Sequence, residues 1–112
     1  LRCPFCHNSS ISWGEEVAEC RERTEYLSPE ELVNAALHYR DRGNIGVAFA
    51  YNEPFVGYEY VRDTARLVHD MGMYNVMVTN GTAELSVYSE LAPYIDAMNI
   101  DLKTFAEKTY AK

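Results

Sequence analysis

Cys3 and Cys6 are the residues of this sequence whose spacing most directly suggests chemistry. Thiolates two residues apart can bind one metal centre from the same turn of the chain. A zinc ribbon would need a second such pair, and only Cys20 remains. A thioredoxin-like redox pair normally lies between a strand and a helix. The odd number of cysteines argues against a disulfide framework and for a reducing, cytosolic setting with a metal or redox role.

Three polar clusters form a second group of candidates, because each follows an apolar run that is typical of a strand. They are Asn52-Glu53-Pro54, Thr79-Asn80-Gly81 and Asp101-Leu102-Lys103. Asn, Gly and Pro are also ordinary turn formers, so any one cluster alone is explained as well by a turn. Three of them at corresponding positions suggest a site.

The elements that would position these clusters alternate between helix and strand. Ser28-Pro29-Glu30-Glu31 predicts a capped helix start, and Gly43 a stop. The almost wholly apolar run 45–51 predicts a buried strand. A helix is expected over 54–71, ended by Gly72, with a buried stripe of Val61, Ala65, Leu67, Val68 and Met71.

The same alternation continues to the end of the chain. Residues 74–79 predict a strand, 84–91 a shorter helix ended before Pro93, and 95–102 contain a third strand. Residues 1–25 are interpreted as a loop with a turn at Trp13-Gly14, and residues 108–112 as the start of a helix. Strands alternating with helices predict an α/β fold with a parallel sheet, whose carboxyl ends lie on one rim.

The length and net charge of the chain exclude several classes of function. The chain has 112 residues, enough for one domain with a modest core, and a formal net charge of -7. This charge argues against general binding to nucleic acids or to an anionic membrane surface. No apolar run is long enough to cross a bilayer, and no signal peptide is visible, so we expect a cytoplasmic protein.

Residues 1–8, Leu-Arg-Cys-Pro-Phe-Cys-His-Asn, resemble the later part of the cluster loop of radical S-adenosylmethionine (SAM) enzymes, C-x-x-x-C-x-aromatic-C. Activating enzymes of glycyl radical enzymes and their relatives continue with His-Asn, as this chain does at His7 and Asn8. The first cysteine of that motif would lie four residues before Cys3, two positions before Leu1. The resemblance therefore implies that Cys3 and Cys6 ligate a [4Fe–4S] cluster.

Three further segments resemble the same family in the same order. Residues 50–54, Ala-Tyr-Asn-Glu-Pro, are similar to its Gly-Gly-Glu-Pro strand end, with Tyr51 and Asn52 in place of the glycines. A Tyr-Asn-Glu-Pro form is familiar in the branch of pyruvate formate-lyase activating enzyme and the AmmeMemoRadiSam enzymes. Val-Thr-Asn-Gly at 78–81 is similar to Asp-Thr-Asn-Gly, with Val78 in place of the aspartate. Asn-Ile-Asp-Leu-Lys at 99–103 is similar to the family's Asp-Leu-Lys.

The resemblance implies a fold, cofactors and a reaction. Residues 1–112 would be the N-terminal part of a radical SAM core domain, cut at both ends, and an incomplete (β/α) partial barrel. The full protein would bind a [4Fe–4S] cluster and reductively cleave SAM to a 5′-deoxyadenosyl radical for hydrogen abstraction. The residues implied to contact SAM are Asn8, Asn52, Glu53, Thr79, Asn80, Asp101 and Lys103.

The partners and two other functions stay open. The resemblance implies an electron donor such as flavodoxin or ferredoxin, and a substrate that is a glycyl radical enzyme or a small molecule. The alternatives are that this chain alone is an inactive fragment, which could self-associate through uncovered apolar faces, or that it is a zinc-binding interaction module using Cys3 and Cys6. Cys20 is interpreted as a packing cysteine, while His7 has a possible role beside the cluster.

Overall fold

The computed structural model describes residues 2–110 and places three parallel strands side by side in the order β1-β2-β3. The strands are β1 (Gly46–Phe49), β2 (Tyr74–Thr79) and β3 (Ala97–Ile100). Gly46 pairs with Tyr74 and Val76 pairs with Ala97, so the register runs straight across the sheet. The predicted α/β fold with alternating strands and helices is confirmed. The open sheet is consistent with part of a radical SAM barrel.

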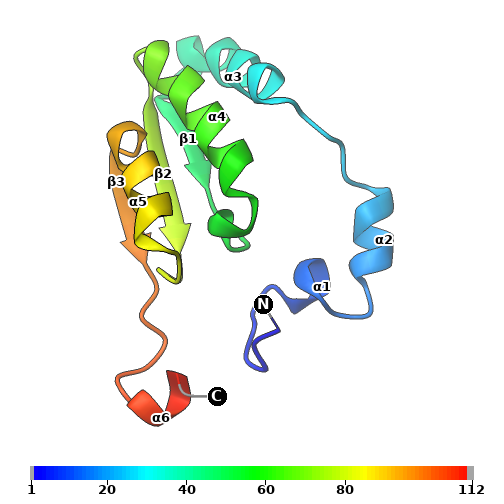
Figure 1. Ribbon diagram of the computed structural model, residues 1–112. Coiled ribbons are helices and arrows are strands. Elements are labelled where there is room, and N and C mark those ends of the chain that lie inside the picture. Colours follow the sequence, from blue (N-terminus) through cyan, green and yellow to red (C-terminus); the bar gives the residue numbers. More distant parts are fainter. Residues whose placement is uncertain (1, 111–112) are drawn as a thin grey trace.

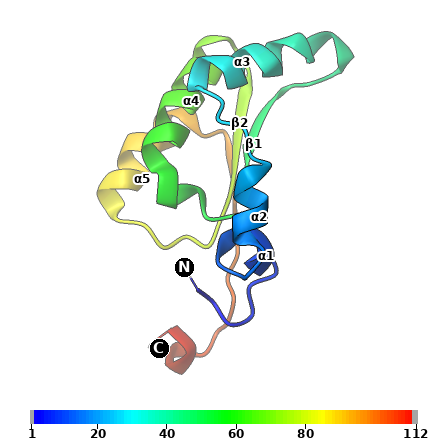
Figure 2. The ribbon, with the colours of Figure 1, turned by 90° about the vertical axis from the view of Figure 1, so that its right-hand side faces the viewer.

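Three helices gather on one face of the sheet (Figures 1 and 2). They are α3 (Pro29–His38), α4 (Tyr58–Asp70) and α5 (Leu85–Leu91). The core between α4, α5 and the sheet contains Phe49, Val61, Ala65, Met77 and Leu91. A second cluster joins α3 to α4 and consists of Val33, Ala36, Val68 and Met73. Two apolar interfaces thus hold the strand ends in place.

The opposite face of the sheet is much more open. Ala48, Ala97 and Asn99 lie on it and are exposed. These side chains alternate with the core residues along each strand, as the two-residue period of a strand requires.

Helix α3 begins as its sequence predicts. The Ser28 hydroxyl accepts a hydrogen bond from the Glu31 backbone N–H, and the Glu31 carboxylate accepts one from the Ser28 N–H. This reciprocal capping box satisfies two N–H groups that the helix leaves unpaired. After α3 a short 3₁₀ turn (Arg40–Arg42) leads to Gly43, whose φ of 92° ends the helical segment in the left-handed region.

Two predictions about helices are wrong. The opening segment is not only a loop, because it contains α1 (Ser9–Ser12) and α2 (Val17–Glu22) around the predicted Trp13-Gly14 turn. Each is too short to show a helical period in the sequence. The helix expected over 54–71 begins as a 3₁₀ turn (Pro54–Gly57), and α4 starts only after Gly57.

The buried stripe of α4 also differs from the prediction. Val61, Ala65 and Val68 are buried, but Met71 is 48% exposed, because it lies one residue past the helix end beside Gly72. Thr64, which is not part of the predicted stripe, is fully buried. The last element of the described residues is α6 (Glu107–Tyr110), where a helix start was expected from residue 108. Residues 111–112 of that prediction lie outside the described residues. Within residues 2–110, no helix is long and apolar enough to cross a membrane.

Candidate functional site

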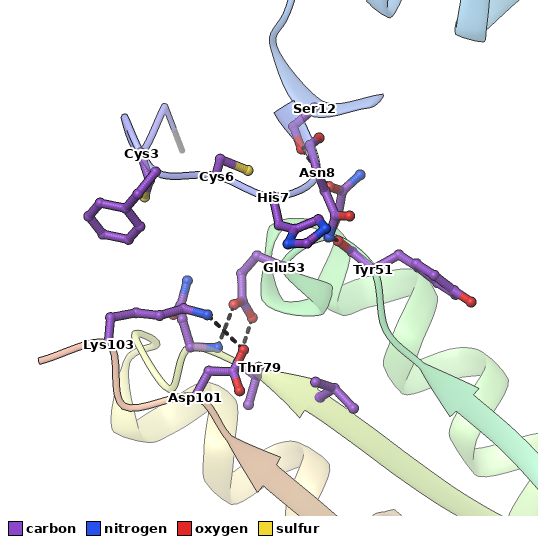
Figure 3. A pocket seen from close by; sticks show the side chains of 14 residues that line it. Cys3, Cys6, His7, Asn8, Ser12, Tyr51, Glu53, Thr79, Asp101 and Lys103 are labelled. Carbon is purple, nitrogen blue, oxygen red and sulfur yellow. Dashed lines mark hydrogen bonds and ion pairs between the residues drawn. The ribbon is translucent and has the colours of Figure 1, made fainter. Parts of the chain in front are cut away.

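The carboxyl ends of the three strands meet the cysteine segment at one pocket of about 440 Å³ (Figure 3). The segment that carries the cysteines, residues 2–12, is called the cysteine loop below. Nine residues expected from the sequence to form the site line this pocket: Cys3, Cys6, Asn8, Asn52, Glu53, Thr79, Asn80, Asp101 and Lys103. The parallel arrangement explains the convergence of the last six, because parallel strands all end at the same edge.

Glu53 is the most firmly held of these side chains. Its Oε1 accepts hydrogen bonds from the Thr79 hydroxyl at 2.6 Å and from the Phe55 backbone N–H at 3.3 Å. Its Oε2 accepts one from the Asn80 backbone N–H at 2.8 Å. Thr79 Oγ1 in turn accepts from the Gly81 N–H at 3.1 Å. One carboxylate therefore joins the ends of β1 and β2.

A ring pair lies beside this carboxylate. Phe55 and Tyr88 meet edge to face with centroids 4.8 Å apart. Burial raises the pKa of Tyr88, and the negative charge of Glu53 raises it further. Tyr88 is therefore a neutral group next to the pocket at physiological pH.

Asp101 and Lys103 form an ion pair on the rim after β3, with Lys103 Nζ 2.8 Å from Asp101 Oδ2. The hydrogen bond from Lys103 holds the pKa of Asp101 below its ordinary value, and a bond from Asn99 at 3.3 Å acts in the same direction. The bond to Asp101 raises the pKa of Lys103, and Cys3 and Cys6 lie near enough to raise it further. Both side chains are about half exposed, so this ion pair contributes little to stability.

The cysteine loop forms the opposite wall. A turn closed by the Cys6 N–H and the Cys3 carbonyl, 3.0 Å apart, brings the two half-buried thiols together. Neither is in a disulfide. His7 lines the same pocket, as does Phe5. The pocket thus pairs soft sulfur donors with carboxylate, amide and ammonium groups, which suits a metal centre beside a zwitterionic ligand.

The remaining cysteine and histidines lie elsewhere. Cys20 is on α2 and is not among the pocket residues, and His38 and His69 are exposed on α3 and α4. Four pocket residues were not expected to form the site: Phe5, Ser12, Tyr51 and Val78. Phe5 is the aromatic residue of the cysteine motif, and Tyr51 and Val78 stand where the sequence departs from the family pattern. Ser12 carries no sequence signal, because its partner lies 40 residues away.

The donor set can be compared with what a metal requires. Among residues 2–110, no group of three or more His, Cys, Asp or Glu side chains is placed to hold a metal ion. The two thiols of the pocket could therefore supply only part of a coordination shell. A structural zinc site would need four ligands.

Comparison with known proteins identifies relatives along the whole chain. The sequence profile of the radical SAM superfamily matches residues 1–112. The uncharacterized protein MJ0808 of Methanocaldococcus jannaschii is 39% identical over 108 residues, which cover 96% of this chain. A pyruvate formate-lyase-activating enzyme of Clostridium pasteurianum is 28% identical over 113 residues, or 98% of this chain. The chain spans 30% of the length of the first relative and 44% of the second.

Proposed function

Because the chain belongs to the radical SAM superfamily, whose members are typically enzymes that use a [4Fe–4S] cluster and SAM, we propose that its pocket is the site of both cofactors. The observation that carries this proposal is the convergence of two thiols and three polar strand ends on one pocket of suitable size. Pockets for small molecules are typically about 300–1,000 Å³. When bound, the cluster supplies the electron that cleaves SAM to a 5′-deoxyadenosyl radical for hydrogen abstraction.

Cys3 and Cys6 are the proposed cluster ligands. They supply two thiolates, and a cluster that leaves one iron open for SAM needs three. The proposal therefore requires a third thiolate, for which a cysteine two positions before Leu1 is the candidate. Residues 1–112 are accordingly proposed to be the N-terminal part of a longer core domain.

Glu53 is the proposed acceptor for the ammonium group of SAM. A carboxylate offers about four lone-pair directions. Oε1 already accepts two hydrogen bonds and Oε2 accepts one. One direction on Oε2 is thus left for a ligand, and the other three bonds hold the group in place before the ligand arrives.

The other rim residues are proposed to contact the remaining parts of SAM. Asp101 can accept hydrogen bonds from ribose hydroxyls, and Lys103 can pair with the SAM carboxylate. Asn8, Asn52 and Asn80 offer amide groups at the pocket wall. Thr79 is 2% exposed and binds Glu53, so its proposed contribution to SAM binding is to hold that carboxylate.

We further propose that the longer protein is an activating enzyme or a close relative of one. Support comes from the similarity to the Clostridium pasteurianum enzyme and from the Cys-His-Asn and Tyr-Asn-Glu-Pro motifs. Its substrate would be a glycyl radical enzyme or a small molecule, and a flavodoxin or ferredoxin would donate the electron. The chain covers 30% and 44% of the two relatives, so the substrate of the longer protein stays a proposal.

Anaerobic reconstitution of the full-length protein with iron and sulfide tests the proposal. We expect the visible absorbance of a [4Fe–4S] cluster and, with a strong reductant, 5′-deoxyadenosine from SAM. Glu53→Gln should weaken SAM binding about tenfold or more, because a charge-assisted hydrogen bond is lost. Glu59→Gln, at an exposed carboxylate in the first turn of α4, is the matched control. Absence of both the absorbance and 5′-deoxyadenosine would refute the proposal.

A second candidate concerns the 112-residue chain by itself. Because it presents two thiols at the pocket, we propose that the isolated chain does not retain a [4Fe–4S] cluster and is inactive. Iron and sulfide analysis of the anaerobically purified chain decides this. Zinc without iron in the same sample would instead favour a zinc-binding module that uses Cys3 and Cys6.

A further inference from the structure

Two side-chain hydrogen bonds connect the cysteine loop to the turn that follows β1. The Asn8 side-chain amide donates to the Tyr51 backbone carbonyl. The Ser12 hydroxyl lies 2.6 Å from Asn52 Oδ1. The bonded residues are 43 and 40 positions apart in the sequence. Figure 3 shows Asn8 and Ser12 on the loop above Tyr51 and Glu53.

Tyr51 has a conformation that needs an explanation. It is the non-glycine residue with a positive φ, 74°, among residues 2–110. A left-handed conformation costs a residue with a Cβ of order 1 kcal/mol or more, and the surroundings must compensate. Packing of the ring does not do so, since the side chain is 80% exposed. The carbonyl of Tyr51, in contrast, is used by Asn8.

Ser12 links both sides of the contact. Its Oγ lies 2.7 Å from the Asn8 carbonyl and 2.6 Å from Asn52 Oδ1. A hydroxyl has one proton to donate and can also accept. Ser12 can therefore donate to either oxygen, and rotation of the Asn52 amide by 180° would let it donate to the carbonyl while accepting from Asn52. Either arrangement keeps Ser12 between the loop and the turn.

We propose that Ser12, together with Asn52, is a positioning pair that holds the cysteine loop on the end of β1 and so sets where Cys3 and Cys6 lie relative to Glu53. Asn52 and Glu53 are adjacent, so a hydrogen bond to Asn52 fixes the loop directly beside the carboxylate that β1 and β2 share. This contact does not require a cofactor, because every group that forms it belongs to the chain. Its consequence for SAM rests on the function proposed above.

The first test uses the full-length protein without its cluster. Alkylation by iodoacetamide is followed at Cys3, Cys6 and Cys20 by mass spectrometry of peptides. In Ser12→Ala, we expect Cys3 and Cys6 to react about fivefold faster, the factor for one net hydrogen bond, because the loop opens more often. Cys20 on α2 should react at the wild-type rate. Ser10→Ala, two residues away on the exposed side of α1, is the matched control, and Ser12→Thr should restore slow alkylation.

Coupling between the two residues is the second readout. Asn52→Ala should accelerate alkylation as Ser12→Ala does, and the double variant should add little to either. Unchanged rates in Ser12→Ala, equal acceleration at Cys20, or additive effects in the double variant would each overturn the proposal.

A third readout connects the hold to the cofactors. In the reconstituted protein, Ser12→Ala should raise the KM for SAM more than it lowers kcat and should alter the SAM-induced change in the electron paramagnetic resonance spectrum of the reduced cluster. Ser12→Thr should restore both. If wild-type protein forms no cluster, the proposed function fails while the alkylation result still decides whether Ser12 holds the loop.

Discussion

A single carboxylate, Glu53, joins the ends of two strands by accepting hydrogen bonds from the Thr79 hydroxyl and the Asn80 backbone N–H. The Thr79 hydroxyl donates a hydrogen bond to Glu53 and accepts one from the Gly81 N–H. Thr79 is 2% exposed, so these bonds replace those that water would make. A partly buried carboxylate that lost this donor would be left with less compensation for its lost hydration. The position of Glu53 thus depends on a residue of the neighbouring strand.

The variants Thr79→Val and Thr79→Ser separate the hydroxyl from the shape of the side chain. Thr79→Val keeps the volume but removes the donor and the acceptor, so we expect the free energy of unfolding to fall by about 1–3 kcal/mol. Thr79→Ser keeps the hydroxyl and should lose less. Urea denaturation of the three proteins measures this. Equal stability of the valine variant and wild type would show that the hydroxyl contributes nothing.

Tyr88 should make the free energy of unfolding decrease at alkaline pH. Its pKa is raised in the folded state by burial and by Glu53, whereas the unfolded chain ionises near the ordinary value of about 10. The contribution of Tyr88 is therefore fully present below about pH 10 and is lost as pH rises through its folded pKa. In Tyr88→Phe, the free energy of unfolding should decrease less steeply above pH 10. Urea denaturation at pH 8 and pH 10.5 measures the difference, and identical slopes would contradict it.

The order of residue types along the chain predicted which polar side chains come together, because parallel strands end at one edge. What the sequence could not predict are the pairings within the site. Nothing in the Thr79-Asn80-Gly81 motif shows that Thr79 bonds Glu53, since a threonine at the end of a strand can equally face solvent. Ser12 depends on a contact across 40 residues, and the folded path of the chain creates that contact.

At the scale of elements, the close approach of β1 and β2 depends on Gly46. A Cβ at this position would lie 1.8 Å from the Tyr74 carbonyl oxygen, its partner across the sheet. Backbone atoms cannot move away without breaking the pairing that sets the register. Because Glu53 follows β1 and Thr79 ends β2, this spacing also determines whether the two side chains meet.

Gly46→Ala should therefore lower the free energy of unfolding by about 3 kcal/mol, at the upper end of the range for overpacking. Gly57→Ala is a matched control, since a Cβ there would meet nothing within 4 Å and its φ of −118° is open to any residue. It should change stability by less than about 1 kcal/mol. Denaturant unfolding measures both variants, and similar losses in the two would contradict a steric role for Gly46.

Helix boundaries show where local signals are strong enough to predict structure. The reciprocal Ser28 and Glu31 bonds were predictable, because both partners lie within one turn. The start of α4 was not, because Pro54 predicts a helical first turn, and the chain forms this turn as a 3₁₀ turn over Pro54–Gly57. Helices α1 and α2 were not predicted, because four and six residues are too few to reveal a helical period in the sequence.

The whole molecule exposes more surface than a compact chain of its size. Its accessible surface is 8428 Å², against about 6,300 Å² expected from its mass. Its radius of gyration of 15.5 Å exceeds the expected value of about 13 Å. Part of the excess comes from the opening segment with α1 and α2, which stands away from the helices on the sheet (Figure 1). Part comes from the open face of the sheet and the outer edge of β3.

That edge leads to the last prediction, which is that the 112-residue chain associates with itself. Within residues 2–110, β3 pairs only with β2, so its outer backbone groups can pair with another chain. Apolar side chains follow along the same segment, with Ile100 56%, Leu102 59% and Phe105 96% exposed. Sedimentation velocity should show the weight-average mass rising with concentration. Replacing Leu102 and Phe105 together by serine should reduce the rise, whereas Tyr26→Ser, at an 81% exposed ring between α2 and α3, should not. A monomer at every concentration, or equal effects of the two changes, would show that the β3 edge does not drive association.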